Sequence, residues 1–215
     1  MNTALSASAH LQQALRALPL VAILRGLRPE DAVAVGLALH GAGFRLIEVP
    51  LNSPEPLRSI ALLRAHLPPD ALVGAGTVLS PAAVAQVQAA GGRWIVMPHA
   101  DTAVIREAKA RDLACVPGIA TPTEAFAALA AGADALKLFP AELVHPAALK
   151  AMRAVLPTDL CLLPVGGITP ERMADYRAAG ASGFGLGSAL YAPGMAAPQV
   201  AERAQAFVQA WRSLA

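Results

Sequence analysis

Residues 45–54, Arg-Leu-Ile-Glu-Val-Pro-Leu-Asn-Ser-Pro, join a short apolar run to a helix start. The apolar run, residues 45–49, is typical of a buried strand. Ser53 and Pro54 are typical of a first helical turn, because serine caps free N–H groups there and proline lacks an N–H that would have no helical partner. This stretch therefore predicts one strand–helix unit, and it carries a carboxylate, Glu48, inside the apolar strand.

The same unit recurs along the whole chain. Helix starts are expected at or near Pro29, Pro54, Pro81, Asp101, Pro122, Pro146, Pro170 and Pro198. Each follows an apolar run, and the expected strands are 21–24, 45–49, 71–74, 94–97, 113–116, 135–138, 161–164 and 183–186. Continuously apolar strands that alternate with helices predict a parallel sheet covered by helices.

The number of units indicates how the sheet is arranged. Eight strand–helix units in 215 residues predict an α/β fold, a compact (β/α)8 TIM barrel. We expect a single domain, residues 1–215, with the barrel in 19–215 and an extra N-terminal helix in 1–18. An open doubly wound sheet is the alternative, but it would need more polar edge strands.

The composition excludes several classes of protein. The chain is 55% hydrophobic and 15% charged, with a mean hydropathy of +0.49 and a net charge of +2. Disorder needs low hydrophobicity and high net charge, and nucleic-acid or anionic-membrane binding needs a stronger basic balance. Two uncharged stretches, 71–92 and 178–201, contain the glycines and prolines of barrel loops and are not clean spanning helices.

The cysteines and histidines predict neither a disulfide framework nor a metal. Cys115 and Cys161 lie in apolar runs, which is typical of buried thiols in a reducing cytoplasm. No signal peptide is visible, so we expect a cytoplasmic protein. No HxH, HExxH or CxxC motif occurs, and no metal is expected. His99 follows a strand, where a hydrogen-bonding role is the simpler interpretation.

Barrel active sites lie at the carboxyl ends of the strands, which makes Lys137 the first candidate. The other two lysines, Lys109 and Lys150, fall on helix-like segments, whereas Lys137 lies within the apolar run 135–140. Burial there would lower the pKa of the amine and leave a neutral nucleophile able to form a Schiff base. The alternative is a buried structural salt bridge or a lysine that reaches out to water.

Two more charged residues occupy strand positions. Glu48 in a dry barrel mouth would have a raised pKa and could exchange protons near neutrality; alternatively it only pairs with a buried cation such as Lys137. Arg25 ends the first strand and could bind a carboxylate or phosphate through its fork of N–H groups. A plain surface arginine is equally consistent with that position.

Glycine-rich turns follow the last two strands, at 164–169 and 185–188. Glycines let backbone N–H groups approach an anion, and phosphate sites after strands 7 and 8 recur in this fold. A Gly-Gly pair alone would indicate only a tight turn. Two such turns at matching positions favour phosphate binding.

Four blocks resemble one known family. They are Ile47-Glu48-Val49-Pro50-Leu51, Gly74-Ala75-Gly76-Thr77-Val78-Leu79, Leu136-Lys137-Leu138-Phe139-Pro140 and Gly166-Gly167-Ile168-Thr169-Pro170. In order and spacing they resemble the 2-keto-3-deoxy-6-phosphogluconate aldolases, whose two branches act on the phosphogluconate or the phosphogalactonate sugar acid. The gluconate branch usually has arginine and threonine where this chain has Asn52 and Val165. These differences favour the galactonate branch.

The resemblance implies a class I aldolase that cleaves 2-dehydro-3-deoxy-6-phospho-D-galactonate to pyruvate and D-glyceraldehyde 3-phosphate, in galactonate catabolism. Lys137 would form the Schiff base and Glu48 would move protons, without an organic cofactor. The substrate would be held by Arg25 and Thr77 at its carboxylate, by Pro98 and Phe139 as pocket walls, and by Gly166, Gly167, Gly187 and Ser188 near its phosphate. Val165 is also expected to bind substrate. The resemblance also implies a homotrimer.

Three other functions stay open from the sequence. The closest is the gluconate specificity of the same family. A sugar-phosphate isomerase or epimerase would keep the barrel and use Lys137 only electrostatically. A sugar-phosphate-binding barrel without catalysis is the third.

Overall fold

Strands and helices alternate through the computed structural model, which describes residues 5–214. The strands are β1 (Leu20–Ile23), β2 (Leu46–Pro50), β3 (Leu72–Gly76), β4 (Trp94–Val96), β5 (Ala114–Val116), β6 (Gly118–Ile119), β7 (Leu136–Leu138), β8 (Leu162–Pro164) and β9 (Phe184–Leu186). The helices are α1 (Ala7–Ala17), α2 (Pro29–Gly41), α3 (Pro56–His66), α4 (Pro81–Ala89), α5 (Thr102–Ala110), α6 (Pro122–Ala130), α7 (Pro146–Arg153), the 3₁₀ helix η1 (Pro170–Arg172), α8 (Met173–Ala178) and α9 (Ala197–Arg212).

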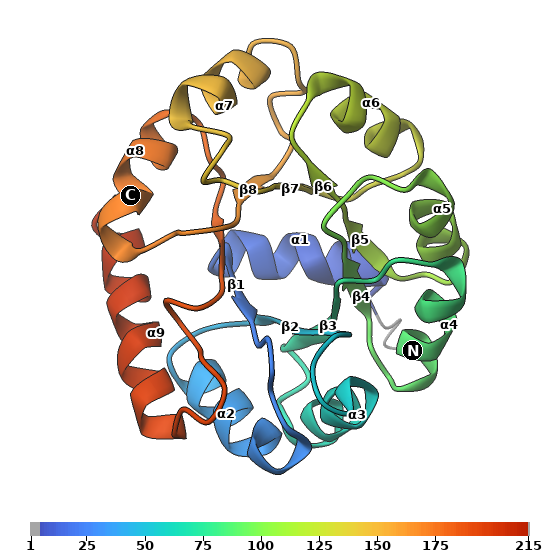
Figure 1. Ribbon diagram of the computed structural model, residues 1–215, viewed down its shortest axis with the longest axis vertical. Helices are drawn as coiled ribbons and strands as arrows, with labels where there is room; N and C mark the ends of the chain where they lie inside the picture. The colour runs from blue at the N-terminus through green and yellow to red at the C-terminus, as the bar shows by residue number, and fades with distance from the viewer. Residues whose placement is uncertain (1–4, 215) are drawn as a thin grey trace.

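The strands form a curled parallel sheet with the helices on its outer side (Figure 1). All paired strands run parallel, in a six-stranded sheet of order β5-β4-β3-β2-β1-β9 and a three-stranded sheet of order β6-β7-β8. The strand residues are buried without alternation, as expected for strands covered on both faces. The expected α/β class with a parallel sheet is confirmed, and closure of that sheet into a (β/α)8 barrel stays a prediction.

The expectation of one continuous eight-stranded sheet needs correction at two places. The fifth expected strand, 113–116, appears as β5, and an additional short strand, β6, follows Pro117; the two are separate because proline has no N–H for a ladder hydrogen bond. At this junction the Asp134 N–H donates to the carbonyl O of Cys115 at 3.0 Å. Between β8 and β9 the contact is a single parallel bridge, Val165 with Gly185, and the Ser182 N–H donates to Leu162 O at 2.9 Å.

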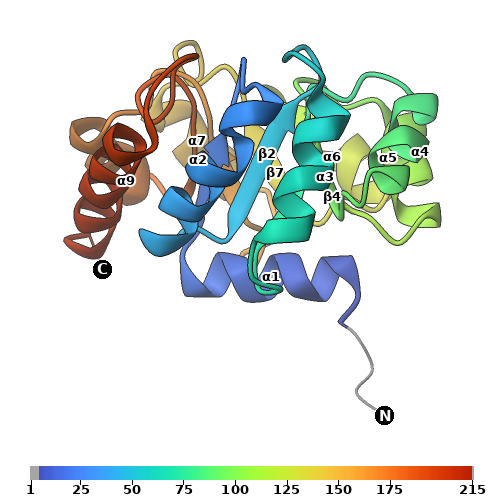
Figure 2. The ribbon, with the colours of Figure 1, turned by 90° about the horizontal axis from the view of Figure 1, so that it is seen from below.

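Helix α1 lies across the amino ends of the strands (Figure 2). Its buried residues recur at helical spacing and share one inner apolar cluster with strand residues such as Trp94. These helix residues are Ala7, Leu11, Ala14 and Leu15. The expected N-terminal helix is therefore confirmed, except that residues 1–4 lie outside the described residues. No helix in the described range 5–214 is long and apolar enough to cross a membrane.

Most expected helix starts are confirmed, and one is wrong. The Thr121 side chain accepts from the Glu124 N–H, and the Glu124 side chain completes the capping box. Helix α3 begins at Pro56, two residues later than expected, because Glu55 takes a left-handed conformation with φ of 41°. Ser53 therefore does not cap this helix, and its Oγ accepts instead from the Gly26 N–H at 2.9 Å.

Candidate active site

Lys137 lies on β7 with its side chain directed away from bulk water. Only 7% of the residue is exposed, and Nζ sits 4.5 Å from the ring centroid of Phe139. Burial lowers the pKa of the amine; the nearby Glu48 carboxyl opposes this shift, and Arg25 adds to it. The alternative of a lysine that reaches out to water does not describe this buried side chain, and a neutral amine is accessible at lower pH than for an ordinary lysine.

Glu48 lies on β2 and is 1% exposed. Burial raises the pKa of its carboxyl from 4.5 to about 7, although the charges of Lys137 and Arg25 act in the opposite direction. Within residues 5–214 its Oε2 has no hydrogen-bond partner, and neither Glu48 nor Lys137 forms an ion pair. The buried salt-bridge interpretation therefore does not describe this pair, and the carboxyl is suited to exchange protons near neutrality.

Gly76, at the end of β3, provides the space for this carboxyl. A Cβ atom on Gly76 would lie 1.4 Å from Glu48 Oε2 and 2.3 Å from its Cδ. The Glu48 side chain therefore rests directly on the Gly76 backbone. Only glycine at this position leaves the carboxyl where the fold places it.

The Gly76→Ala substitution should lower activity about 100-fold, because a displacement of about 1 Å of a reacting group can cost that much. The measurement is kcat for the reaction that the sequence resemblance predicts, together with the melting temperature. The matched control is Gly41→Ala, where a Cβ would meet nothing within 4 Å. Unchanged kcat in Gly76→Ala would show that the position of Glu48 does not matter.

A cavity of about 620 Å³ opens at the carboxyl ends of β1, β7, β8 and β9. Eight residues expected from the sequence line it together: Arg25, Lys137, Phe139, Val165, Gly166, Gly167, Gly187 and Ser188. Lys137 also lines a smaller cavity inside the sheet, of about 10 Å³, and Glu48 and Trp94 line that one. Lys137 thus connects the inner carboxyl with the outer, solvent-reachable cavity.

The first glycine turn has the backbone that an anion site needs. Gly166 and Gly167 have φ of 115° and 58°, in the left-handed region that favours glycine. The turn is fixed by Arg172, whose Nη1 donates to Gly167 O at 2.6 Å. Glu142 packs against it, because a Cβ on Gly166 would lie 2.1 Å from Glu142 Oε2.

Two expected residues are not among those lining either cavity. Thr77 follows β3, is half-buried and has φ of 54°, and Pro98 follows β4. Both lie at the carboxyl ends of strands, on the same end of the sheet as Lys137. Their expected contacts with substrate stay predictions.

Sequence reasoning did not assign several residues that line the cavity. Asn52 accepts a hydrogen bond from Arg25 Nη1 at 2.6 Å, so it orients the arginine. Glu142, Tyr191 and Pro193 also line the cavity. Glu142 follows Lys137 closely in the sequence, but an exposed glutamate in a loop carries no signal of its own.

A buried lysine and a buried carboxyl, under a cavity with glycine turns at the carboxyl edge of a parallel sheet, are typical of an aldolase that uses a lysine nucleophile. Comparison with known proteins agrees. A family model described as "KDPG and KHG aldolase" matches residues 11–205. The chain belongs to this family, and it is accordingly an enzyme, a carbon–carbon lyase.

Several relatives are similar over nearly the full length. The chain is 51% identical to a "Probable 2-dehydro-3-deoxy-6-phosphogalactonate aldolase" of Rhizobium meliloti (strain 1021), over 90% of this chain and 91% of the relative. It is 47% identical to the 2-dehydro-3-deoxy-6-phosphogalactonate aldolase of Escherichia coli (strain K12), over 91% and 95%. A solved structure described as "Native KDPGal structure" is similar with a TM-score of 0.90 and 46% identity, over 92% of this chain and 96% of that one.

Proposed function

We propose that this enzyme is a class I aldolase that cleaves 2-dehydro-3-deoxy-6-phospho-D-galactonate to pyruvate and D-glyceraldehyde 3-phosphate. The observation that carries the proposal is the placement of Lys137 and Glu48 on one internal cavity, with opposite shifts of their pKa values. Groups whose environments shift their pKa values in this way are suited to acid–base and nucleophilic roles near neutrality. The names of the two relatives support the substrate.

In the proposed reaction Lys137 Nζ attacks the C2 ketone, and loss of water gives a protonated imine. Glu48, as the carboxylate, takes the proton of the C4 hydroxyl while the C3–C4 bond breaks, and D-glyceraldehyde 3-phosphate leaves. The bonding electrons move into the imine and form an enamine. Protonation at C3 and hydrolysis then release pyruvate and the free lysine. The lysine itself accepts the electrons, so the proposal includes no cofactor.

A water molecule fits the space between the two groups. The inner cavity of about 10 Å³ is at the lower limit of the space that one water occupies. The unpaired Glu48 Oε2 would accept a hydrogen bond from such a water. We propose that this water relays protons between Glu48 and the carbinolamine on Lys137.

The remaining side chains would orient the substrate. Arg25, held by Asn52, would bind the substrate carboxylate together with Thr77, while Phe139 and Pro98 would wall the reacting carbons. The phosphate would lie in the region lined by Gly166, Gly167, Gly187 and Ser188, and Val165 would contact the substrate just before the first of these turns. Left-handed glycines present backbone N–H groups to an anion without a side chain in the way, which supports this placement.

Comparing the two C4 epimers tests the substrate. We expect kcat/KM for the galactonate epimer to exceed that for the gluconate epimer by roughly 10–200-fold, the range that a small change in a pocket supplies. Val165 replaces the threonine of the gluconate branch, so the Val165→Thr variant should narrow this ratio. A preference for the gluconate epimer would assign the chain to the other substrate. Turnover of neither epimer would contradict the proposed activity.

Closure of the barrel, the oligomeric state and the location in the cell are also proposals. We infer that the two sheets are arcs of one closed (β/α)8 barrel and one domain; the hydrogen bonds at Cys115 and Leu162 and the core cluster extending from Leu18 to Val208 support this. The homotrimer follows from the family resemblance, and exposed apolar side chains such as Phe126 and Leu143 are available for subunit contacts. The free thiols of Cys115 and Cys161 support a cytoplasmic location.

A further inference from the structure

A second cavity, of about 430 Å³, lies at the opposite end of the sheet from Lys137, beneath helix α1. Three of its lining residues, Arg45, Asp70 and Arg93, come just before β2, β3 and β4. Helix α1 contributes residues from the other side. The full lining is Leu5, His10, Gln13, Ala14, Ala17, Arg45, Arg64, Pro69, Asp70 and Arg93.

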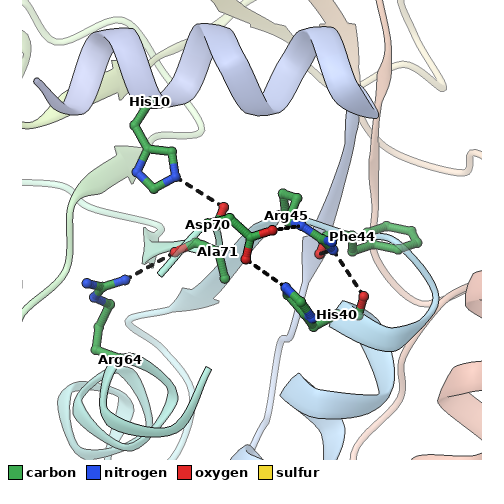
Figure 3. A network of polar contacts seen from close by, with 7 residues as sticks. All are labelled: His10, His40, Phe44, Arg45, Arg64, Asp70 and Ala71. Carbon is green, nitrogen blue, oxygen red and sulfur yellow. Dashed lines mark hydrogen bonds and ion pairs between the residues drawn. The ribbon is translucent and has the colours of Figure 1, made fainter. Parts of the chain in front are cut away.

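Among the described residues that line this cavity, Asp70 is the one carboxylate, and both of its oxygens already have hydrogen-bond partners (Figure 3). Its Oδ1 accepts from His40 Nε2 at 2.9 Å, and its Oδ2 accepts from Arg45 Nε. Partial burial acts to raise the pKa of the Asp70 carboxyl, but these hydrogen bonds and the two cationic groups hold it below its ordinary value. Both carboxylate oxygens of Asp70 are therefore already hydrogen-bonded, one by His40 and one by Arg45.

Arg64 and Arg93 have no comparable partner. In the described residues 5–214, each guanidinium donates one hydrogen bond to a backbone carbonyl, Arg64 to Ala71 O at 3.1 Å and Arg93 to Leu5 O at 3.2 Å. Neither forms an ion pair within that range. Burial lowers the pKa of Arg64, and the positive charge of Arg93 lowers it further. The first four residues, Met-Asn-Thr-Ala, bring no carboxylate.

We propose that this cavity is a second anion site, which binds a small dianion of the phosphate class between Arg64 and Arg93. A guanidinium has five N–H donors in a fixed fork that matches phosphate oxygens, and most of those donors are unused here. The positive charges of Arg64 and Arg93 repel each other in this partly buried cavity. A dianion bound between them would attract both and offset that repulsion. His10, whose Nε2 donates to Asp70 O at 3.1 Å, lines the same cavity from α1.

The site is separate from the proposed chemistry. The catalytic cavity lies at the carboxyl ends of the strands, whereas this cavity lies at their amino ends, so the two are divided by the sheet. None of the residues assigned above to substrate binding or catalysis lines it. Binding here would hold α1 against the strands, since His10, Gln13 and Ala14 belong to α1 and Arg93 bonds to Leu5 just before it.

The test is equilibrium dialysis of the purified protein with radiolabelled inorganic phosphate, in the wild type and in the double variant Arg64→Gln/Arg93→Gln. We expect the double variant to bind one phosphate fewer per chain and to lose the phosphate-dependent rise in melting temperature that binding to the folded state produces. Its aldolase activity should be unchanged. The matched control is Arg16→Gln, which removes an exposed positive charge from α1 outside the cavity.

A second variant keeps the test valid if the double variant folds poorly. Gln13→Glu places a carboxylate at the cavity and leaves both arginines and their backbone hydrogen bonds in place. It too should bind one phosphate fewer per chain. Equal phosphate binding in the wild type and in Gln13→Glu, or an equal loss in Arg16→Gln, would overturn the proposal and leave the arginines a purely structural role. Neither result would affect the proposed aldolase activity.

Discussion

The Lys137→Met variant is expected to lose aldol cleavage by on the order of 10⁴–10⁶-fold, the range seen when a covalent nucleophile is removed. Methionine has a similar length and suits a residue that is 7% exposed beside the Phe139 ring, so the fold should persist. The measurement is kcat, together with borohydride reduction in the presence of pyruvate. In the wild type a reduced pyruvate adduct should appear on the peptide that contains Lys137, and in the variant it should be absent.

The matched control is Lys150→Met, which removes an exposed lysine on α7 and should keep both activity and adduct. An adduct on Lys109 or Lys150 in the wild type would contradict the assignment of the nucleophile. Activity that survives in the Lys137→Arg variant without any adduct would favour the isomerase or epimerase interpretation, in which the lysine acts only through its charge.

The Glu48→Gln variant is expected to lose roughly 10²–10⁴-fold in kcat, the usual contribution of a positioned acid–base group. The pH profile should change as well. In the wild type Glu48 loses its proton near its pKa of about 7, so the rate of C–C cleavage should rise with pH through that region. The variant has no such group, and its residual rate should lack this step. If the rate of the variant still rises with pH near 7, a residue other than Glu48 causes this pH dependence.

The same substitution should change stability in a pH-dependent way. Because the folded pKa of Glu48, about 7, lies above the ordinary 4.5, folding favours the protonated form, and this contribution is lost as the pH rises through 7. Glutamine never ionises. Urea denaturation at pH 8 should therefore show the variant more stable by on the order of 3 kcal/mol, with the difference vanishing at pH 4.5 and below. Equal stability at both pH values would mean that Glu48 is not desolvated in the fold.

The strand–helix order could be predicted from local signals, since most apolar runs are followed by a helix start marked by proline, often with a capping residue before it. Local signals failed where a nonlocal contact decided the structure. Ser53 looks like a helix cap in the sequence, but its hydroxyl accepts from Gly26 in another unit. The break at Pro117 separates β5 from β6, and these two strands belong to different sheets. The sequence contains no direct sign of which strands each of them pairs with.

The proposed catalytic pair, Lys137 and Glu48, could be singled out from the sequence because charge is rare in this chain and both residues lie inside apolar strands. The role of Gly76 was not predictable from its own signal, because a glycine in a strand does not reveal which side chain will lie against it. The arginines that line the cavity beneath α1 could not be singled out from the sequence either. Arg45 and Arg93 are ordinary polar residues just before strands, Arg64 lies in the last turn of α3, and only the packing of α1 over them encloses a cavity.

Helix α1 also affects the chemistry from a distance. Its apolar face closes the amino end of the sheet and joins the cluster of Trp94 and Val21, which also line the inner cavity beside Glu48. The pKa of Glu48 is raised because burial removes its carboxyl from bulk water. Without α1, the amino end of the curled sheet would be open, and solvent could enter between the strands from that end. By closing the amino end of the sheet, the helix keeps the local dielectric constant low around Glu48, the group proposed to transfer protons.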